Sequence, residues 1–384
     1  FFFVSKMGNK PGRTRVNEDG SPKQKVCKDD FEVICSIGEG NYANVLLVKK
    51  KGGDEYFAMK ILSKDSLIAR DEVEHTRTER KILECATHPF LVKMHYAFQT
   101  SESLYIVMGF ANGGELFSHL KKEKRFSEDR ARFYAAEIAL GLEYLHDGGV
   151  VYRDLKPENI LLDSEGHIIL TDFGLSKILK GDKTKTFCGT PEYLAPEVLL
   201  NTGHGKPVDW WSFGTLLYEM VVGIPPFYST DVSEMYDLIV HGELYVPEFV
   251  SPTTADLLTK LLVRDPNKRI GTGPDGTKQI KNHAFFKTVD WKALYNRQVQ
   301  PPFKPAVKGP DDISNVDPQF TEKQAEIGNT PQDSEFKPDA GLFDGFTYER
   351  SGVILDNTPG AARTQERQRV LAEANSVTAQ SCDL

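Results

Sequence analysis

One segment of the chain concentrates side chains that could do chemistry. Asp154, Lys156 and Asn159 lie close together, and a second carboxylate, Asp172, follows after a short apolar run. Carboxylate and amide oxygens are ligands that Mg²⁺ prefers, a carboxylate can orient a hydroxyl and accept its proton, and a lysine can neutralise charge on a phosphoryl group. These residue types in this order favour phosphoryl transfer, and a purely structural origin for the joint pattern is improbable.

A glycine-rich turn upstream fits the same chemistry. Glycines let backbone N–H groups approach phosphates closely because no Cβ intervenes. The turn runs Gly38-Glu39-Gly40-Asn41-Tyr42-Ala43-Asn44-Val45. Taken alone it is weak evidence, since an ordinary hairpin explains it equally well. Ala43 stands where the pattern GxGxxGxV has its third glycine, and because alanine is the smallest replacement we expect the loop still to close.

A lysine on the next apolar run needs a partner. An unpaired ammonium inside an apolar strand is costly, so we expect Lys60 to pair with Glu79, which lies on a predicted helix. The alternative is a lysine at a strand edge whose ammonium extends to water.

The elements that must position these residues form two groups. Short β-branched runs predict strands at 31–37, 44–50, 55–62, 94–99 and 103–108, with a turn at 51–54 and one main helix at 72–85. Beyond 112–114 helical periodicity dominates, with Ser127 as the expected N-cap of a helix that ends at 148–149 and further helices at 207–222, 231–242, 253–263 and 278–285. The sequence therefore predicts an α+β fold with a small sheet-rich lobe over 31–108, a larger helical lobe over 112–286 and a ligand cleft between them.

Composition and charge exclude several classes of protein. The chain of 384 residues is 40% hydrophobic and 27% charged, which fits a folded protein with a sizeable core, and no apolar run approaches the roughly 18 residues of a membrane span. The net charge is −8, and the acidic character of residues 309–360 argues against a nucleic-acid binder. The scattered cysteines predict free thiols in the cytosol; they are Cys27, Cys35, Cys85, Cys188 and Cys382.

The motifs, in this order, carry a resemblance. Residues 31–286 resemble a eukaryotic protein kinase domain over its whole length, which implies a two-lobed kinase fold that uses ATP and Mg²⁺. The implied roles are a lysine that holds the α/β-phosphates (Lys60) and the acid that fixes it (Glu79), a catalytic base (Asp154), a lysine that steadies the transferring group (Lys156) and two magnesium ligands (Asn159 and Asp172). The nucleotide would lie against Ile37, Gly38, Glu39, Gly40, Asn41, Tyr42, Ala43, Asn44, Val45, Ala58, Lys60, Met108, Phe110 and Ala111.

The same resemblance implies bracing residues in the large lobe. Ala195-Pro196-Glu197 matches the end of the activation segment, with Arg269 as the buried partner of Glu197. Asp209 matches the helix carboxylate that braces the catalytic loop.

The substrate side resembles the serine/threonine type, on the evidence of Lys156 and Thr190. Glu115, Glu158 and Glu219 match positions that pair with substrate arginines in cyclic-nucleotide-dependent kinases. Singly, each is an ordinary surface acid. Together they predict a substrate with arginine at the third position before the Ser/Thr and another further upstream.

Control elements narrow the resemblance to the AGC group, where the chain looks nearest to the serum- and glucocorticoid-regulated, protein kinase B and ribosomal-protein kinase branches. The expected activation-loop phosphosite is Thr186, and its phosphate would pair with His75, Arg153 and Lys177. Two further phosphosites are expected in the tail, Thr330 in a turn motif and Thr347 in a hydrophobic motif whose aromatic residues are Phe343, Phe346 and Tyr348.

The hydrophobic motif predicts a switch. We expect Phe343 and Phe346 to insert into a small-lobe pocket and so brace the helix that carries Glu79; the expected pocket residues are Leu67, Ile68, Val73, Thr76, Gln99 and Leu104. The alternative is a tail that merely covers apolar surface.

The remaining expectations concern organisation and partners. Residues 1–29 are expected to be disordered, 287–358 to form an extended tail and 359–384 to be a mobile extension. The expected partners are protein substrates with upstream arginines and an activating kinase resembling 3-phosphoinositide-dependent kinase. We expect a monomer without nucleic acid or a transmembrane segment, located in the cytoplasm and compatible with nuclear or peripheral membrane pools. The alternative function is a pseudokinase scaffold, which the complete set of catalytic residues disfavours.

Overall fold

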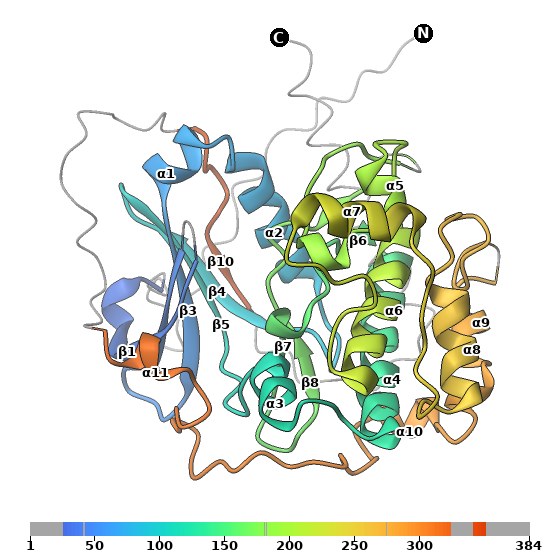
Figure 1. The fold of residues 1–384 in the computed structure, drawn as a ribbon. Coiled ribbons are helices and arrows are strands. Elements are labelled where there is room, and N and C mark those ends of the chain that lie inside the picture. The colour runs from blue at the N-terminus through green and yellow to red at the C-terminus, as the bar shows by residue number, and fades with distance from the viewer. Residues whose placement is uncertain are drawn as a thin grey trace, which may run out of the picture.

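The computed structural model describes residues 26–40, 43–179, 181, 183–273, 275–323 and 341–350. Figure 1 shows a sheet-rich lobe beside a helix-rich lobe, with a C-terminal segment that runs along both. The predicted α+β class and the two-lobed architecture are confirmed.

The small lobe is built on one antiparallel sheet. Its strands are β1 (Phe31–Glu39), β2 (Ala43–Lys50), β3 (Tyr56–Ser63), β4 (Met94–Gln99), β5 (Ser103–Gly109) and β10 (Tyr348–Glu349), in the order β1-β2-β3-β5-β4-β10. Two helices accompany it, α1 (Lys64–Ala69) and α2 (Val73–Cys85). β10 comes from the C-terminal segment, so the tail completes the edge of the sheet (Figure 1).

The large lobe is built around two buried helices. These are α4 (Glu128–Asp147) and α6 (Pro207–Val222). The remaining helices are α3 (Leu116–Glu123), α5 (Pro196–Leu199), α7 (Val232–His241), α8 (Pro252–Leu261) and α9 (Thr277–Lys281), and the short strands are β6 (Val150–Val151), β7 (Ile160–Leu162), β8 (Ile168–Leu170) and β9 (Lys177–Ile178). The Ser127 hydroxyl accepts a hydrogen bond from the Arg130 N–H at 3.3 Å, which confirms the predicted N-cap of α4.

Three expectations about helices need correction. The sequence patterns predicted neither α1 nor α3, because each spans only about two turns and such short helices depend on tertiary packing. The helix expected at 278–285 is two elements: α9 ends at Lys281, and a 3-10 turn follows at Ala284–Phe286. The break occurs because the His283 ring accepts a hydrogen bond from the Phe285 N–H at 3.2 Å and caps the second element.

The tail lies on both lobes. It includes α10 (Trp291–Tyr295) and α11 (Pro318–Thr321) and passes the connector that follows β5. There the Asn112 amide donates to the Gly309 carbonyl at 2.9 Å, and the Asn315 amide donates to the Asn112 carbonyl at 3.0 Å. Gly114 has φ +85°, and a Cβ at this position would lie 2.9 Å from the Asn315 carbonyl oxygen, so glycine is required for the tail to pack here.

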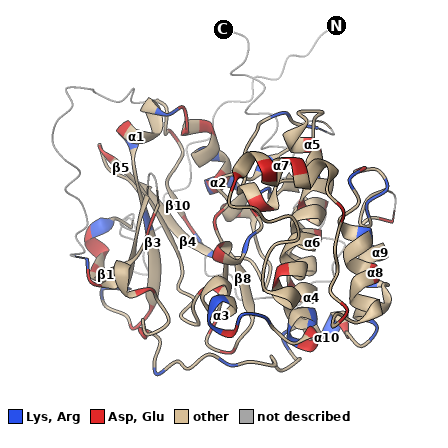
Figure 2. Cartoon of the chain, in the orientation of Figure 1, with Lys and Arg blue, Asp and Glu red and all other residues tan. Residues whose placement is uncertain are grey.

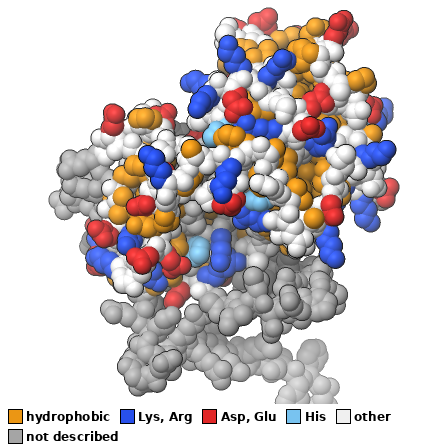
Figure 3. All heavy atoms as spheres, turned by 90° about the horizontal axis from the view of Figure 1, so that it is seen from below, with side chains coloured by type: hydrophobic (Ala, Val, Ile, Leu, Met, Phe, Trp, Pro, Cys, Tyr) orange, Lys and Arg blue, Asp and Glu red, His pale blue; other side chains and the backbone are white. Residues whose placement is uncertain are grey.

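Charged side chains of both signs are interspersed over the two lobes in Figure 2 and on the face seen in Figure 3. The described cysteines Cys27, Cys35, Cys85 and Cys188 form no disulfide with one another. Within the described ranges, none of the helices combines the length and apolar character that crossing a membrane requires.

Candidate active site

Lys60 is positioned by the centre of the small-lobe sheet. It lies opposite Val45 of β2 and Ile106 of β5. Its Nζ contacts Glu79 Oε1 at 2.6 Å and Asp172 Oδ1 at 3.3 Å, so it links α2 to the large lobe. Burial lowers the pKa of the Lys60 ammonium, but the two carboxylates outweigh burial and hold this pKa above its usual value.

The predicted metal ligands lie on the large lobe, and one of them, Asp172, contacts this lysine. The Lys60 ammonium holds the pKa of the Asp172 carboxyl below its usual range, so Asp172 is ionised at neutral pH. The Asn159 Nδ2 donates to the Asp154 backbone oxygen and to Asp154 Oδ2, each at 2.8 Å, which leaves its amide oxygen as the atom that could bind a cation. One carboxylate and one amide oxygen fit Mg²⁺, which commonly takes only one or two protein ligands besides phosphate oxygens and water.

Asp154 lies in a compact polar group. Asp154 Oδ1 accepts a hydrogen bond from the Thr190 hydroxyl at 2.9 Å, and its Oδ2 lies 3.1 Å from the Lys156 Nζ. Lys156 in turn donates to the Thr190 hydroxyl at 2.9 Å. The structure therefore brings together a carboxylate, an ammonium and a hydroxyl at one point, with Asn159 fixing the carboxylate from behind.

A buried carboxylate on α6 holds the loop that carries Asp154. Asp209 is fully buried, and its oxygens accept hydrogen bonds from the Tyr152 N–H at 2.9 Å and the Arg153 N–H at 2.8 Å. It also contacts the His146 Nε2 at 2.6 Å. His146 was missed by the sequence analysis, because only the fold brings the end of α4 next to α6.

The predicted nucleotide residues line the first strands and the connector. Ile37, Gly38 and Glu39 end β1, and the Gly40 N–H donates to the Ala43 carbonyl at 2.7 Å, which closes the glycine-rich turn with alanine in place. Asn44 and Val45 lie on β2, Ala58 lies opposite Met108 across β3 and β5, and Phe110 and Ala111 follow β5. Asn41 and Tyr42 lie outside the described residues.

The predicted substrate acids influence one another. Burial raises the pKa values of Glu115 and Glu158, and Glu158 contributes to the rise at Glu115. The pKa of Glu219 is raised to about 7. Burial is the main cause and the charges of Glu158 and Glu192 add to it, whereas a hydrogen bond from the Tyr193 hydroxyl lowers this pKa. Glu192 was not predicted as a member of this acidic group.

Of the residues predicted to pair with a phosphate on Thr186, Lys177 contacts the Thr186 hydroxyl in the structure. The Lys177 Nζ donates to the Thr186 hydroxyl at 3.3 Å. Arg153 is buried, and its Nη1 and Nη2 atoms have no hydrogen-bond partner among the described residues. The His75 ring contacts the Glu72 carboxylate at 2.8 Å.

A histidine that the sequence analysis missed lies near this segment. His204 is buried, its backbone pairs with Thr184, and its Nε2 has no partner in the described part of the chain. Burial lowers the pKa of His204, and the charge of Arg153 lowers it further. No motif in the sequence distinguishes this histidine, because the signal is its burial in the folded chain.

The end of the segment is held by a buried ion pair. Arg269 Nη1 and Nη2 donate to Glu197 Oε1 at 2.7 Å and Oε2 at 2.9 Å, which is the bidentate geometry of a strong pair. The structure thus places these two residues together as the resemblance implied.

The hydrophobic motif lies on the small lobe. Phe343 and Phe346 are each 3% exposed and belong to the same apolar cluster as Leu67 and Leu104, with Ile68 and Val73 packed against that cluster. The Gln99 amide donates to the Phe343 carbonyl at 2.9 Å. Thr347 is exposed and Tyr348 begins β10, whereas Thr330 lies outside the described residues.

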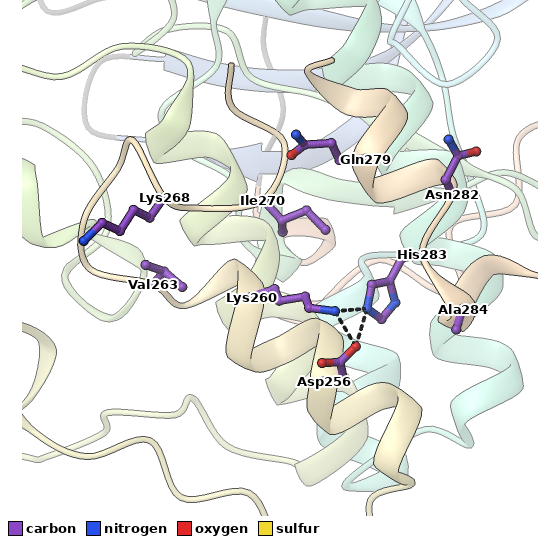
Figure 4. Close-up of a pocket in the computed structure, with 9 residues that line it drawn as sticks. All are labelled: Asp256, Lys260, Val263, Lys268, Ile270, Gln279, Asn282, His283 and Ala284. Atoms are coloured by element: carbon purple, nitrogen blue, oxygen red, sulfur yellow. Dashed lines mark hydrogen bonds and ion pairs between the residues drawn. The ribbon is translucent and has the colours of Figure 1, made fainter. Parts of the chain in front are cut away.

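The large lobe also has a surface pocket of about 530 Å³ between α8 and α9 (Figure 4). Asp256 contacts Lys260 at 2.6 Å and the His283 ring at 2.8 Å there, so these polar groups satisfy one another. None of the predicted site residues lines this pocket. It is separate from the group around Asp154.

Comparison with known proteins agrees with this geometry. The sequence family "Protein kinase domain" matches residues 31–286, and the family "Protein kinase C terminal domain" matches residues 307–348. The chain is 54% identical over 343 residues to "Protein kinase 2" of Dictyostelium discoideum, covering 87% of this chain and 70% of that protein.

Two human proteins are also similar. "Serine/threonine-protein kinase Sgk2" of Homo sapiens is 49% identical over 339 residues, which cover 87% of this chain and 92% of the relative. "Ribosomal protein S6 kinase alpha-3" of Homo sapiens is 48% identical over 334 residues, which cover 85% of this chain but only 44% of the relative.

The chain belongs to the protein kinase family. Within that family it is a serine/threonine kinase of the AGC group, similar to the serum- and glucocorticoid-regulated and ribosomal-protein kinases, and its domain implies ATP as substrate together with a divalent cation.

Proposed function

We propose that this kinase transfers the γ-phosphoryl group of ATP, with Mg²⁺, to Ser or Thr hydroxyls that follow upstream arginines in protein substrates. We further propose that phosphorylation of Thr186 and Thr347 activates it. The observation that carries the catalytic part is the group around Asp154, in which Thr190, Lys156 and Asn159 all contact one carboxylate.

Each residue of the group has a distinct task. Asp154 orients the substrate hydroxyl and accepts its proton, and the bond from Asn159 keeps the carboxylate in one orientation. Lys156 lies within 3.1 Å of that carboxylate and neutralises negative charge that develops on the transferring group. Bound ATP supplies the phosphoryl group and bound Mg²⁺ supplies charge neutralisation, with Asn159 and Asp172 as the protein ligands.

The Lys60–Glu79 pair prepares the small lobe. Because Lys60 also contacts Asp172, its ammonium connects the helix α2 to the metal-binding carboxylate across the two lobes. We propose that it holds the α/β-phosphates and that Glu79 keeps it in place. Residues 31–286 then act as the kinase domain and residues 287–358 as its tail.

The arginine preference rests on charge. Burial raises the pKa values of Glu115, Glu158 and Glu219, and neighbouring acids raise them further, although at Glu158 the Lys156 ammonium acts in the opposite direction. A substrate guanidinium relieves this repulsion and forms charge-assisted hydrogen bonds. We propose that these acids select arginines upstream of the acceptor.

Activation rests on donors that lack partners. The two unpartnered Arg153 nitrogens are buried, which is costly unless an anion satisfies them, and Lys177 already contacts Thr186. We propose that a phosphate on Thr186 fills this need. The buried rings of Phe343 and Phe346 support the second part, in which tail docking braces α2.

The catalytic proposal is tested by a kinase assay on the full chain phosphorylated at Thr186 and Thr347. We expect transfer of labelled phosphate from ATP, with Mg²⁺, to a Ser peptide with two upstream arginines, and a fall in kcat of about 10²- to 10⁴-fold for Asp154→Asn. The matched control is Asp29→Asn, an exposed aspartate that precedes β1 and should retain wild-type activity. Equal rates for wild type and Asp154→Asn would refute the assigned base, and equal kcat/KM for peptides with and without arginines would refute the substrate preference.

A further inference from the structure

Besides burying Phe343 and Phe346, the tail makes backbone contacts with the small lobe. β10 pairs antiparallel with β4, with Tyr348 opposite Ala97, and so extends the edge of the sheet. The next residue continues this pairing, because the Arg350 N–H donates to the His95 carbonyl at 2.9 Å. The backbone of Arg350 is therefore fixed where its side chain can reach past β4.

The Arg350 guanidinium spans the two ends of the loop between α2 and β4. Its Nη1 donates to the Met94 carbonyl at 3.3 Å, at the start of β4. Its Nη2 donates to the Ala86 carbonyl at 3.2 Å and to the Thr87 hydroxyl at 2.8 Å, at the end of α2. One side chain thus joins three acceptors from both ends of a single loop.

Ala86 is the C-cap of α2, the helix that carries Glu79. Carbonyl groups at the C-terminal end of a helix lack partners within it, and a cation there interacts favourably with the helix dipole. The last turn of α2 has no basic residue of its own. The Tyr144 hydroxyl donates to the Cys85 carbonyl at 3.2 Å, and Arg350 adds from the tail the cation that α2 lacks at this end.

The same loop is attached to the large lobe. The Thr87 N–H donates to the Tyr144 hydroxyl on α4 at 2.8 Å. Further along, the Leu170 N–H on β8 donates to the Phe90 carbonyl at 2.9 Å, and Asp172 follows β8 after one residue. The loop that Arg350 contacts therefore follows the helix of Glu79 and is hydrogen-bonded to the strand that precedes Asp172.

The other tail contacts with α2 lie nearer its middle. The Arg80 Nε donates to the Phe346 carbonyl at 3.1 Å, one residue after Glu79. Phe346 and Arg350 therefore hold α2 at two separate points, its middle and its C-terminal end.

We propose that Arg350 is a positioning residue that caps the C-terminal end of α2 and holds the α2–β4 loop, so that the docked tail keeps Glu79 on Lys60. This inference rests on the proposed activation by the docked tail. It adds a contact that the aromatic residues of the motif do not provide, and it assigns a role to a residue that no motif in the sequence marks.

The test compares Arg350→Ala and Arg350→Lys with wild type in the full chain phosphorylated at Thr186 and Thr347. We expect Arg350→Ala to lower kcat roughly 5- to 10-fold with little change in peptide KM, and Arg350→Lys, which keeps the charge but loses the planar fork, to fall between. Hydrogen exchange of backbone amides over 86–94 should be several-fold faster in Arg350→Ala. The matched control is Arg77→Ala, an exposed arginine of α2 that pairs only with Glu74 among the described residues and should leave both readouts unchanged.

Two outcomes separate this inference from the function on which it rests. Phe346→Ala tests tail activation itself: unchanged kcat in this variant would refute the switch. If Phe346→Ala lowers kcat while Arg350→Ala matches wild type in kcat and in exchange over 86–94, the switch stands and the role of Arg350 is wrong. A Thr87→Val variant removes one acceptor of Arg350. Its fall in kcat should be smaller than that of Arg350→Ala and should vanish when both changes are combined. Full additivity of the two changes would contradict the contact between Arg350 and Thr87.

Discussion

Removal of Arg269 should destabilise the large lobe strongly. Arg269 is 1% exposed. Its side chain donates to both oxygens of Glu197 and also to the carbonyls of Val263 and Pro207, at 3.0 and 2.7 Å. Arg269→Met keeps most of the volume but leaves the Glu197 carboxylate, itself 4% exposed, buried without a counter-ion. Breaking a buried ion pair in this way costs about 3–5 kcal/mol.

That cost converts into a measurable shift. For a unit of this size each kcal/mol lowers Tm by about 2–4 °C, so Arg269→Met should lower Tm by roughly 6–20 °C. Tryptophan fluorescence is a suitable probe, because the chain has 3 tryptophans. The Arg269 guanidinium carbon lies over the Trp211 ring, 5.2 Å from the ring centroid. The other two, Trp210 and Trp291, belong to α6 and α10.

The comparison variant is Glu197→Gln/Arg269→Met. Because the double variant has no unpaired carboxylate, its Tm should recover part of the loss, although the carbonyls that Arg269 satisfied stay unpaired. A fall of less than roughly 2 °C in Arg269→Met would place the pair in the range of surface salt bridges and refute this reasoning. A double variant less stable than Arg269→Met would refute the assignment of the cost to the unpaired charge.

Two further predictions follow from the site. Because the pKa of Glu219 is about 7, its carboxyl is neutral below that pH and ionised above it, so KM for an arginine-containing peptide should fall as pH rises from about 6 to 8; Glu219→Gln should remove this trend, and a trend that persists in the variant would assign it to another group. Arg153→Gln should remove the stability gained on phosphorylation of Thr186, measured as the Tm difference between phosphorylated and unphosphorylated enzyme, because the unpartnered guanidinium nitrogens are gone. An equal Tm gain in Arg153→Gln and wild type would show that the phosphate binds elsewhere.

Much of the fold was predictable because its signals are local. The helix at 207–222 was predicted with the bounds that α6 has, since an apolar run between Pro207 and the left-handed Gly223 marks both of its ends. The glycine-rich turn, the Ser127 cap and the positions of the first five strands likewise follow from short patterns, whereas the pairing of β3 with β5 and of β4 with β10 does not. The helix α3 has no side-chain cap, and α1 has one at Ser63, whose hydroxyl accepts a hydrogen bond from the Ser66 N–H at 3.4 Å. Both helices are short, so their stability depends on packing.

The site was predictable where a motif specifies chemistry and not where it depends on placement. The structure brings Lys60 to Glu79 and Arg269 to Glu197, the partners expected of them. The contact of Asp154 with the Thr190 hydroxyl was not predicted. His75 was expected to pair with a phosphate on Thr186, which stays a prediction; in the structure its ring contacts Glu72, the N-cap of the same helix.

Two residues of the site have a strained backbone conformation that hydrogen bonds hold in place. Arg153 and Asp172 have φ of 68° and 48°, a region that non-glycine residues rarely adopt and that costs of order 1–3 kcal/mol for each residue. At Arg153 the cost is offset by a hydrogen bond from the Arg153 N–H to the carboxylate of Asp209 on α6. At Asp172 it is offset by a hydrogen bond from the Gly174 N–H to the Asp172 carboxylate. The loop that carries Asp154 is therefore held in a conformation it would not adopt alone, so a change at Asp209 should weaken folding and catalysis together, although Asp209 contacts neither reactant.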